Sequence, residues 1–199
     1  MSKVVFDISV SLDGFIAPPN HDPSRLQAWL FNGDTPSKYS DFFTLSAESA
    51  QVFDELLKTT GAIITGRRTY DLTGGWGGSH PVSEKVFVLS RDIPQDIPQG
   101  STTFTFVLDG VESAVRQAKK AAGDKNVYLM GGANVAQQCL NAGLLDEITL
   151  HVVPVLLGQG VRLFDNLEHD TIELEQTKVV QAPGVTHLGF RFIRSQSDD

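Results

Sequence analysis

The chain has 199 residues, of which 41% are hydrophobic and 20% are charged, and its formal net charge at pH 7 is −8. This length and composition are typical of one globular domain with a sizeable core. The negative charge argues against a nucleic-acid partner, because nucleic acids favour basic surfaces. No apolar run approaches the roughly 18 residues of a membrane span, and no signal-peptide core precedes the first predicted strand. We therefore expect a cytoplasmic protein without a membrane partner.

Cysteine and histidine usage limits the chemistry that the chain can carry. Cys139 is the only cysteine, so an internal disulfide and a thiolate metal cluster are both excluded. Its place in a predicted helix favours a small buried side chain over a reactive thiol. The five histidines show no ligand-like spacing. We therefore expect no metal site.

The order of predicted elements indicates the fold class. Strands are predicted at residues 4–10, 61–65, 86–89, 103–107 and 126–130, and helices at residues 24–31, 47–58, 67–72, 110–122 and 133–141. Later strands, at residues 147–155, 171–181 and 185–194, have no helices between them, and Ala182-Pro183-Gly184 predicts a tight turn. This pattern predicts an α/β fold with a central mixed, mostly parallel sheet flanked by helices and a C-terminal antiparallel hairpin. We expect one domain over residues 1–195 and a polar tail over residues 196–199.

The most informative stretch is residues 63–70. Its β-branched strand ends at Gly66 and continues into Arg67, Arg68 and Thr69, which are predicted to open a helix. Free backbone N–H groups at a helix start, together with guanidinium groups, bind anions and above all phosphate. The alternative is a strand-to-helix corner whose arginines only face solvent.

Two further strands end in residues that suit phosphate. Ser90 and Arg91 follow the strand at residues 86–89, and Gly131 and Gly132 follow the strand at residues 126–130. Ligands of such sheets bind beyond the carboxyl ends of the strands, so these corners are expected to lie together. An anionic cofactor on an acidic protein needs local positive charge, which the arginines at these corners supply.

Two loops are candidates for contact with a ligand. Residues 74–78 place four glycines around Trp76, so the backbone is able to approach a ligand closely and the indole to cover it. The alternative is a flexible loop with an anchoring tryptophan. Residues 11–17 follow the first central strand, where a mobile active-site loop often lies, although many such loops are only connectors.

Several of these motifs resemble the dihydrofolate-reductase-like superfamily, and more narrowly the reductase domain of the bifunctional riboflavin-pathway deaminase–reductase and its stand-alone relatives. The resemblance covers nearly the whole chain and is carried by Ser11-Leu12-Asp13-Gly14-Phe15-Ile16-Ala17, Thr65-Gly66-Arg67-Arg68-Thr69-Tyr70, Val88-Leu89-Ser90-Arg91, Gly131-Gly132-Ala133 and Pro154-Val155-Leu156-Leu157-Gly158-Gln159-Gly160. It implies a three-layer dihydrofolate-reductase-like fold that binds NADPH. It also implies hydride transfer to a C=N or C=O group of a pteridine, pyrimidine or ribose, by a homodimer.

The resemblance also implies which residues form the site. The residues expected to hold the cofactor are Gly66, Arg67, Arg68, Thr69, Leu89, Ser90, Arg91, Gly131, Gly132, Ala133 and Asn134. Among these, Ser90 and Arg91 would lie near the adenosine 2′-phosphate. The 11–17 loop would cover the nicotinamide, and Phe15, Ile16 and Trp76 are expected to contact the substrate.

The catalytic carboxylate is less clear, because the sequence departs from the family pattern. A dihydrofolate reductase protonates its pterin through a carboxylate on the helix before the Gly-Arg strand, and here an ungapped count places Ala50 there. Asp54, about one helical turn later, is the better of two nearby candidates, Glu55 being the other, and the alternative is a solvated helix face. Asp13 is the second catalytic candidate, unless it only caps its turn.

We therefore expect an NADPH-dependent reductase of a small heterocyclic or ribosyl substrate. By resemblance the activity is 5-amino-6-(5-phosphoribosylamino)uracil reductase of riboflavin biosynthesis, and only this reductase half is present, since the single cysteine cannot supply the zinc site of a deaminase. A dihydrofolate or pteridine reductase is an alternative that Ala50 disfavours. A non-catalytic nucleotide-binding protein of the same fold is another. The apolar run at residues 152–157 and the C-terminal hairpin form either a dimer surface or part of the core.

Overall fold

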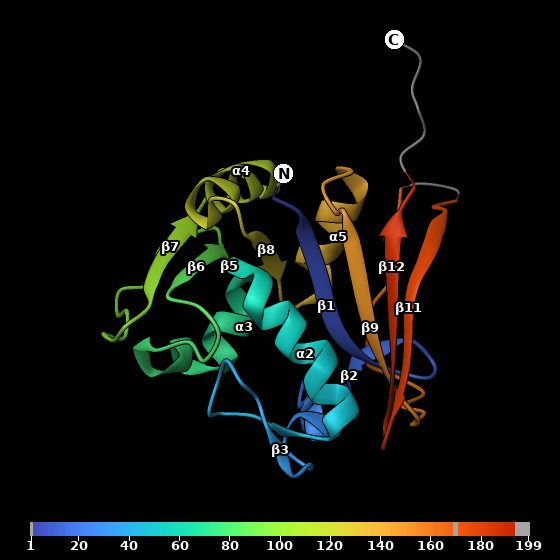
Figure 1. Ribbon diagram of the computed structural model, residues 1–199. Coiled ribbons are helices and arrows are strands. Elements are labelled where there is room, and N and C mark those ends of the chain that lie inside the picture. Colours follow the sequence, from blue (N-terminus) through green and yellow to red (C-terminus); the bar gives the residue numbers. More distant parts are fainter. Residues whose placement is uncertain (1, 169–170, 194–199) are drawn as a thin grey trace.

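The computed structural model describes residues 2–168 and 171–193, and its centre is an eight-stranded sheet (Figure 1). The order of the strands is β11-β12-β9-β1-β8-β5-β6-β7. Their bounds are β1 (Val4–Ser11), β5 (Thr60–Gly66), β6 (Lys85–Leu89), β7 (Thr103–Val107), β8 (Asn126–Leu129), β9 (Glu147–Val153), β11 (Leu174–Ala182) and β12 (Val185–Phe192). Strand β12 is antiparallel to both of its neighbours, and the other neighbouring pairs are parallel. The predicted mixed sheet and C-terminal antiparallel hairpin are confirmed.

Helices cover both faces of this sheet. They are α1 (Ser24–Gln27), α2 (Ala47–Thr59), α3 (Arg67–Leu72), α4 (Val111–Ala122) and α5 (Ala133–Asn141), with short 3-10 turns η1 (Ala28–Leu30) and η2 (Gly74–Gly78). Figure 1 shows α2 lying across one face. There its side chains pack on strand residues such as Val5 and Ile63. Helices α4 and α5 pack on the other face against residues such as Phe6 and Ile64. Because neighbouring strand residues point to opposite faces, the apolar strands feed two cores and the fold has three layers.

Local sequence signals explain where the central helices begin. Ser46 caps α2, since its Oγ accepts a hydrogen bond of 3.2 Å from the Ser49 N–H. Helix α3 begins at Arg67, directly after β5, as predicted. In α5, Cys139 is fully buried, and burial raises the pKa of its thiol to about 12. The prediction of a small buried cysteine is confirmed.

The short strand pairs were not predicted. They are β2 (Phe15–Ala17) with β10 (Val161–Arg162), and β3 (Thr35–Pro36) with β4 (Thr44–Leu45). Segments of two or three residues are too short to show a hydrophobic period. The predicted tail, residues 196–199, and the end of the strand predicted at residues 185–194 lie outside the described residues.

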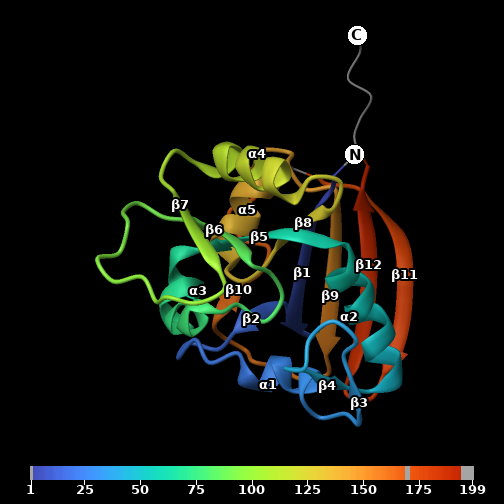
Figure 2. The same ribbon diagram turned by 60° about the vertical axis from the view of Figure 1, so that its left-hand side comes forward.

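The topology brings the informative corners together. Figure 2 shows the sheet with β7 at one edge and β11 at the other, and β5, β6 and β8 lie next to one another between them. Since these three strands are parallel, their carboxyl ends reach the same edge of the sheet. Among the described residues, no helix is long and apolar enough to cross a membrane.

Candidate functional site

A cavity of about 1170 Å³ lies at the carboxyl ends of β5, β6 and β8 and continues towards β1 and β9. Every residue that the sequence predicts to hold the cofactor lines it: Gly66, Arg67, Arg68, Thr69, Leu89, Ser90, Arg91, Gly131, Gly132, Ala133 and Asn134. The corners predicted to lie together therefore do so. That these residues bind a cofactor stays a prediction.

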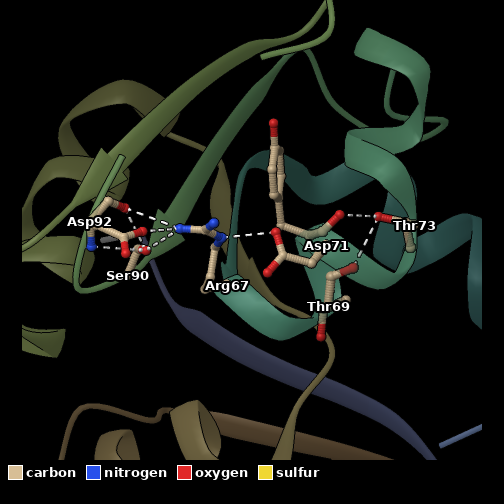
Figure 3. A network of polar contacts seen from close by, with 7 residues as sticks. Arg67, Thr69, Asp71, Thr73, Ser90 and Asp92 are labelled. Atoms are coloured by element: carbon tan, nitrogen blue, oxygen red, sulfur yellow. Dashed lines mark hydrogen bonds and ion pairs between the residues drawn. The ribbon is translucent and has the colours of Figure 1, made fainter. Parts of the chain in front are cut away.

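Arg67 is held by acidic neighbours, as Figure 3 shows. Its Nε donates a 2.8 Å hydrogen bond to Asp71 Oδ1, and its Nη1 donates to Ser90 Oγ at 3.3 Å and to the Asp92 carboxylate. The hydrogen bonds to Asp71 and Asp92 raise the pKa of Arg67. Two carboxylates thus compensate its charge, so Arg67 holds the corner together and has little charge left for a phosphate.

Arg68 and Arg91 are better placed to bind an anion. Both side chains are exposed and line the cavity. Within residues 2–168 and 171–193, no ion pair involves either of them. A cation without a carboxylate partner is free to form the charge-assisted hydrogen bonds that phosphate accepts.

The Gly131-Gly132 corner packs tightly on α3. Gly131 has a φ of 83°, and a Cβ atom there would lie 2.6 Å from Thr69 Oγ1, so only glycine fits. The Gly132 N–H donates a 3.3 Å hydrogen bond to the same hydroxyl. No side chain caps the start of α5 at Ala133. Its first-turn N–H groups, which border the cavity, therefore suit an anionic ligand.

The glycine-rich loop forms a left-handed turn. Gly75, Trp76 and Gly77 have φ values of 58°, 50° and 59°, so the loop is not a regular helix, as predicted. The Trp76 ring stacks on Phe104 and packs edge-on against His80, with centroids 6.4 and 4.4 Å apart. Burial lowers the pKa of His80 to about 4. Trp76 and the neutral His80 both line the cavity as part of its wall.

Asp13 is engaged in the structure of its own loop. Its carboxylate accepts hydrogen bonds from Ser11 Oγ at 2.6 Å, from the Gly158 N–H at 2.7 Å and from the Leu157 N–H at 3.1 Å. These bonds, the one from Ser11 first, lower the pKa of Asp13 to about 2. Asp13 does not line the cavity. The geometry therefore favours the turn-capping alternative over a catalytic role.

Replacing Asp13 with asparagine should destabilise the fold in a pH-dependent way. Because the folded pKa lies below the usual value, the ionised group stabilises the fold above pH 4, and this contribution is lost as the pH falls towards 2. The difference in Tm between wild type and D13N should therefore shrink over that range in thermal melts. Asp124→Asn, at an exposed site, serves as the control. A constant difference at all pH values would contradict the bonding of Asp13.

The other predicted residues divide between wall and core. Ile16 and Trp76 line the cavity, but Phe15 does not. Phe15 is buried, with the Arg162 guanidinium 4.5 Å above its ring, so the structure does not place it against a ligand. Asp54 also lies outside the cavity lining. It is buried and accepts hydrogen bonds from Ser37 Oγ at 2.6 Å and from the Lys38 N–H, so the alternative of a solvated helix face is wrong.

The sequence analysis missed the polar residues at the other end of the cavity. Asp7 on β1 and His151 on β9 line it, and both side chains are almost completely buried. Trp29 lies beside them, and its indole N–H donates a 2.9 Å hydrogen bond to Ser9 Oγ. Asp7 and Ser9 alternate with apolar residues along β1, so they share one face of the strand. A charged residue inside a predominantly apolar strand was the one available signal.

Comparison with known proteins identifies the family. Residues 2–188 match the family described as the RibD C-terminal domain. The chain belongs to the RibD C-terminal domain family. The uncharacterized protein YwjB of Bacillus subtilis (strain 168) is 31% identical over 180 residues, which cover 88% of this chain and 91% of YwjB.

Solved structures show the same fold. A Shewanella sp. PV-4 protein, whose name refers to riboflavin biosynthesis, aligns with a TM-score of 0.76 and 25% identity over 96% of this chain and 99% of its own. Dihydrofolate reductase from Enterococcus faecalis aligns with a TM-score of 0.60 and 15% identity over 96% of each chain. This member of the RibD C-terminal domain family thus has the dihydrofolate-reductase-like fold. Family and fold together support an oxidoreductase of the riboflavin-pathway reductase type.

Proposed function

We propose that this protein is an NADPH-dependent reductase that transfers hydride to a small heterocyclic or ribosyl substrate. The observation that carries the proposal is one cavity with two chemically different ends. At the β5–β6 end lie Arg68 and Arg91, which form no ion pair within the described residues, and at the β1–β9 end lie Asp7 and His151. This arrangement suits a nucleotide that has its phosphates at the first end, with a polar heterocyclic substrate bound next to it at the second end.

The residues at the β5–β6 end fit the anionic part of such a nucleotide. Arg68 and Arg91 would pair with its phosphates, and the Gly131-Gly132 corner would let them approach the first turn of α5. NADPH bound there would supply the hydride. The Enterococcus faecalis dihydrofolate reductase is complexed with NADP(H), which supports the same nucleotide class for this fold. Arg67 would act by holding the corner in place.

The wall residues would order the reacting groups. Ile16 and Trp76 border the cavity, and their apolar surfaces would exclude water next to the hydride donor. Hydride transfer in such a site depends mainly on holding the hydride donor and the acceptor at the right distance and orientation. 5-Amino-6-(5-phosphoribosylamino)uracil is the acceptor to test first, because the name of the Shewanella neighbour refers to riboflavin biosynthesis. A homodimer is a further proposal, supported by the exposed apolar side chains of Leu156 and Val179. A cytoplasmic location is proposed as well.

Replacing Arg91 with alanine should weaken NADPH binding selectively. Losing a charge-assisted hydrogen bond costs about 1.5–3 kcal/mol, so Kd should rise roughly tenfold or more. NADH lacks the 2′-phosphate, and its Kd should change little. Calorimetric titration of both nucleotides measures this, with Arg25→Ala as the control, because Arg25 is an exposed arginine that does not line the cavity.

Two outcomes would count against the proposal at different levels. Equal weakening of NADPH and NADH by R91A would remove Arg91 from the 2′-phosphate site but keep a nucleotide site. Failure of the wild-type protein to bind either nucleotide would exclude the reductase and leave only a shared fold.

A further inference from the structure

A continuous hydrogen-bonded chain of buried side chains, Asp7, His151, His187 and Ser49, starts at the cavity. Asp7 Oδ1 lies 2.8 Å from His151 Nε2, His151 Nδ1 lies 2.7 Å from His187 Nδ1, and His187 Nε2 lies 2.9 Å from Ser49 Oγ. The members come from β1, β9, β12 and α2, and each is at least nine-tenths buried. We call this set the Asp7–Ser49 chain. Burying four polar side chains together costs free energy unless they are hydrogen-bonded, so packing alone does not explain their presence in the core.

In the Asp7–Ser49 chain, the direction of the hydrogen bond between Ser49 and His187 determines which histidine nitrogens carry protons. Burial, then the neighbouring His151 and Lys178, lower the pKa of His187 to about 3, so His187 is neutral at neutral pH. If Ser49 donates to His187 Nε2, His187 must donate from Nδ1 to His151 Nδ1. Neutral His151 then has its proton on Nε2 and donates it to Asp7. Each member thus orients the next, and Asp7 is the end that faces the cavity.

Asp7 has an oxygen available for a ligand. In the described part of the chain, the hydrogen bonds of this carboxylate involve Oδ1 alone. The residue is 5% exposed and borders the cavity, and its Oδ2 accepts no hydrogen bond from the described residues. A buried carboxylate oxygen is costly unless a ligand donates to it or it carries a proton itself. A substrate nitrogen or oxygen beside Oδ2 would satisfy either condition, because it would donate to the ionised oxygen or accept from the protonated one.

Other acidic groups along the cavity are less suited to donate a proton. Asp92 pairs with Arg67 at the opposite end, and His80, with a pKa of about 4, is unprotonated at neutral pH. Tyr128 on β8 borders the cavity, and burial, then the charge of Asp7, raise its pKa well above the usual value. Tyr128 therefore keeps its proton, and the partly exposed His21 also lines the cavity. These two residues are the alternatives to Asp7 as proton donor.

We propose that Asp7 protonates the substrate, and that His151, His187 and Ser49 are positioning residues that orient its carboxyl group. This rests on the proposed reductase function. Bound NADPH would supply a hydride that forms a new C–H bond at a C=N or C=O carbon of the substrate. The π bond would break, and its electron pair would move to the nitrogen or oxygen. That atom takes the proton from Asp7 Oδ2, which leaves a carboxylate that His151 stabilises through Oδ1. The acceptor gains two electrons and two hydrogens, and the nicotinamide is oxidised.

The test is the near-isosteric variant Asp7→Asn, assayed as the intact protein. NADPH oxidation is followed with 5-amino-6-(5-phosphoribosylamino)uracil and with dihydrofolate as acceptors. Loss of a general acid should lower kcat about 100-fold or more. The Kd for NADPH, measured by calorimetry, should stay within about twofold because the cations lie at the other end, which also shows that D7N is folded.

Ser49→Ala tests the positioning residues. It should lower kcat about three- to tenfold with KM nearly unchanged, since His187 loses the donor that sets its tautomer. Ser113→Ala is the matched control, because Ser113 is also a buried helix serine but lies on α4, outside the cavity lining. A purely structural role would lower the Tm of S49A and leave kcat of the folded variant unchanged.

The possible failures can be told apart. Wild-type turnover that D7N keeps within about threefold, or that only Tyr128→Phe or His21→Gln abolishes, would overturn the Asp7 proposal and leave the reductase intact. NADPH binding without turnover of either acceptor would overturn both hydride transfer and the Asp7 step. Absence of nucleotide binding would overturn the reductase function on which the proposal rests.

Discussion

Replacing Trp29 with alanine should lower the free energy of unfolding by about 3–5 kcal/mol, the usual cost of removing a buried aromatic side chain. Trp29 is 7% exposed and packs between α2 and the sheet. Its ring centroid lies 4.5 Å from that of His151, 5.0 Å from that of His187 and 5.9 Å from that of Phe53. The truncated side chain would leave a space beside both histidines of the Asp7–Ser49 chain. Urea unfolding followed by far-ultraviolet circular dichroism measures the loss.

Trp29→Phe is the control that separates packing from hydrogen bonding. Phenylalanine keeps a ring against the histidines but removes the indole N–H that Ser9 Oγ accepts at 2.9 Å. Its loss should be about 1 kcal/mol, the net value of one hydrogen bond, plus the small volume difference. A W29A variant that lost less than W29F would show that the ring does not pack against the histidines.

The strand exits were predictable because their signals are local. Gly66, Ser90 and Gly131 each end an apolar run, and the parallel arrangement of the strands then brings them together. Which arginine is available for an anion was not predictable. Arg67 is neutralised by Asp71, one helical turn away, and by Asp92, which follows another strand. The i, i+4 pairing with Asp71 is visible in the sequence, but the second partner depends on the approach of β5 and β6.

The Asp7–Ser49 chain could not be found by spacing. Asp7 and His151 are 144 residues apart and Ser49 and His187 are 138 residues apart. Their contact depends on the register of β1 with β9 and of β9 with β12, where His151 pairs directly with His187. Such long-range register is set by the whole core. Histidine spacing along the sequence therefore gives no sign that His151 and His187 bond to one another.

Replacing Asp54 with alanine should lower the free energy of unfolding by about 1.5–3 kcal/mol, the value of hydrogen bonds to a charged group. Its carboxylate accepts from Ser37 Oγ at 2.6 Å and from the Lys38 N–H at 3.2 Å, and so ties the segment beside β3 to α2. Asp54→Asn keeps an acceptor oxygen and should lose less. Equilibrium unfolding in urea measures both variants.

A comparison of D54N with D7N decides which buried carboxylate takes part in the reaction. Asp54 was predicted from its helix position, whereas Asp7 is the buried carboxylate that borders the cavity. We therefore expect folded D54N to keep its kcat for NADPH oxidation while D7N loses most of it. If D54N instead lost activity at full nucleotide affinity, Asp54 would be the proton donor, as its helix position first indicated. The Asp7–Ser49 chain would then only stabilise the core. Because both variants replace a buried carboxylate with an amide of equal size, the difference between them reports the position of the group and not the loss of its charge.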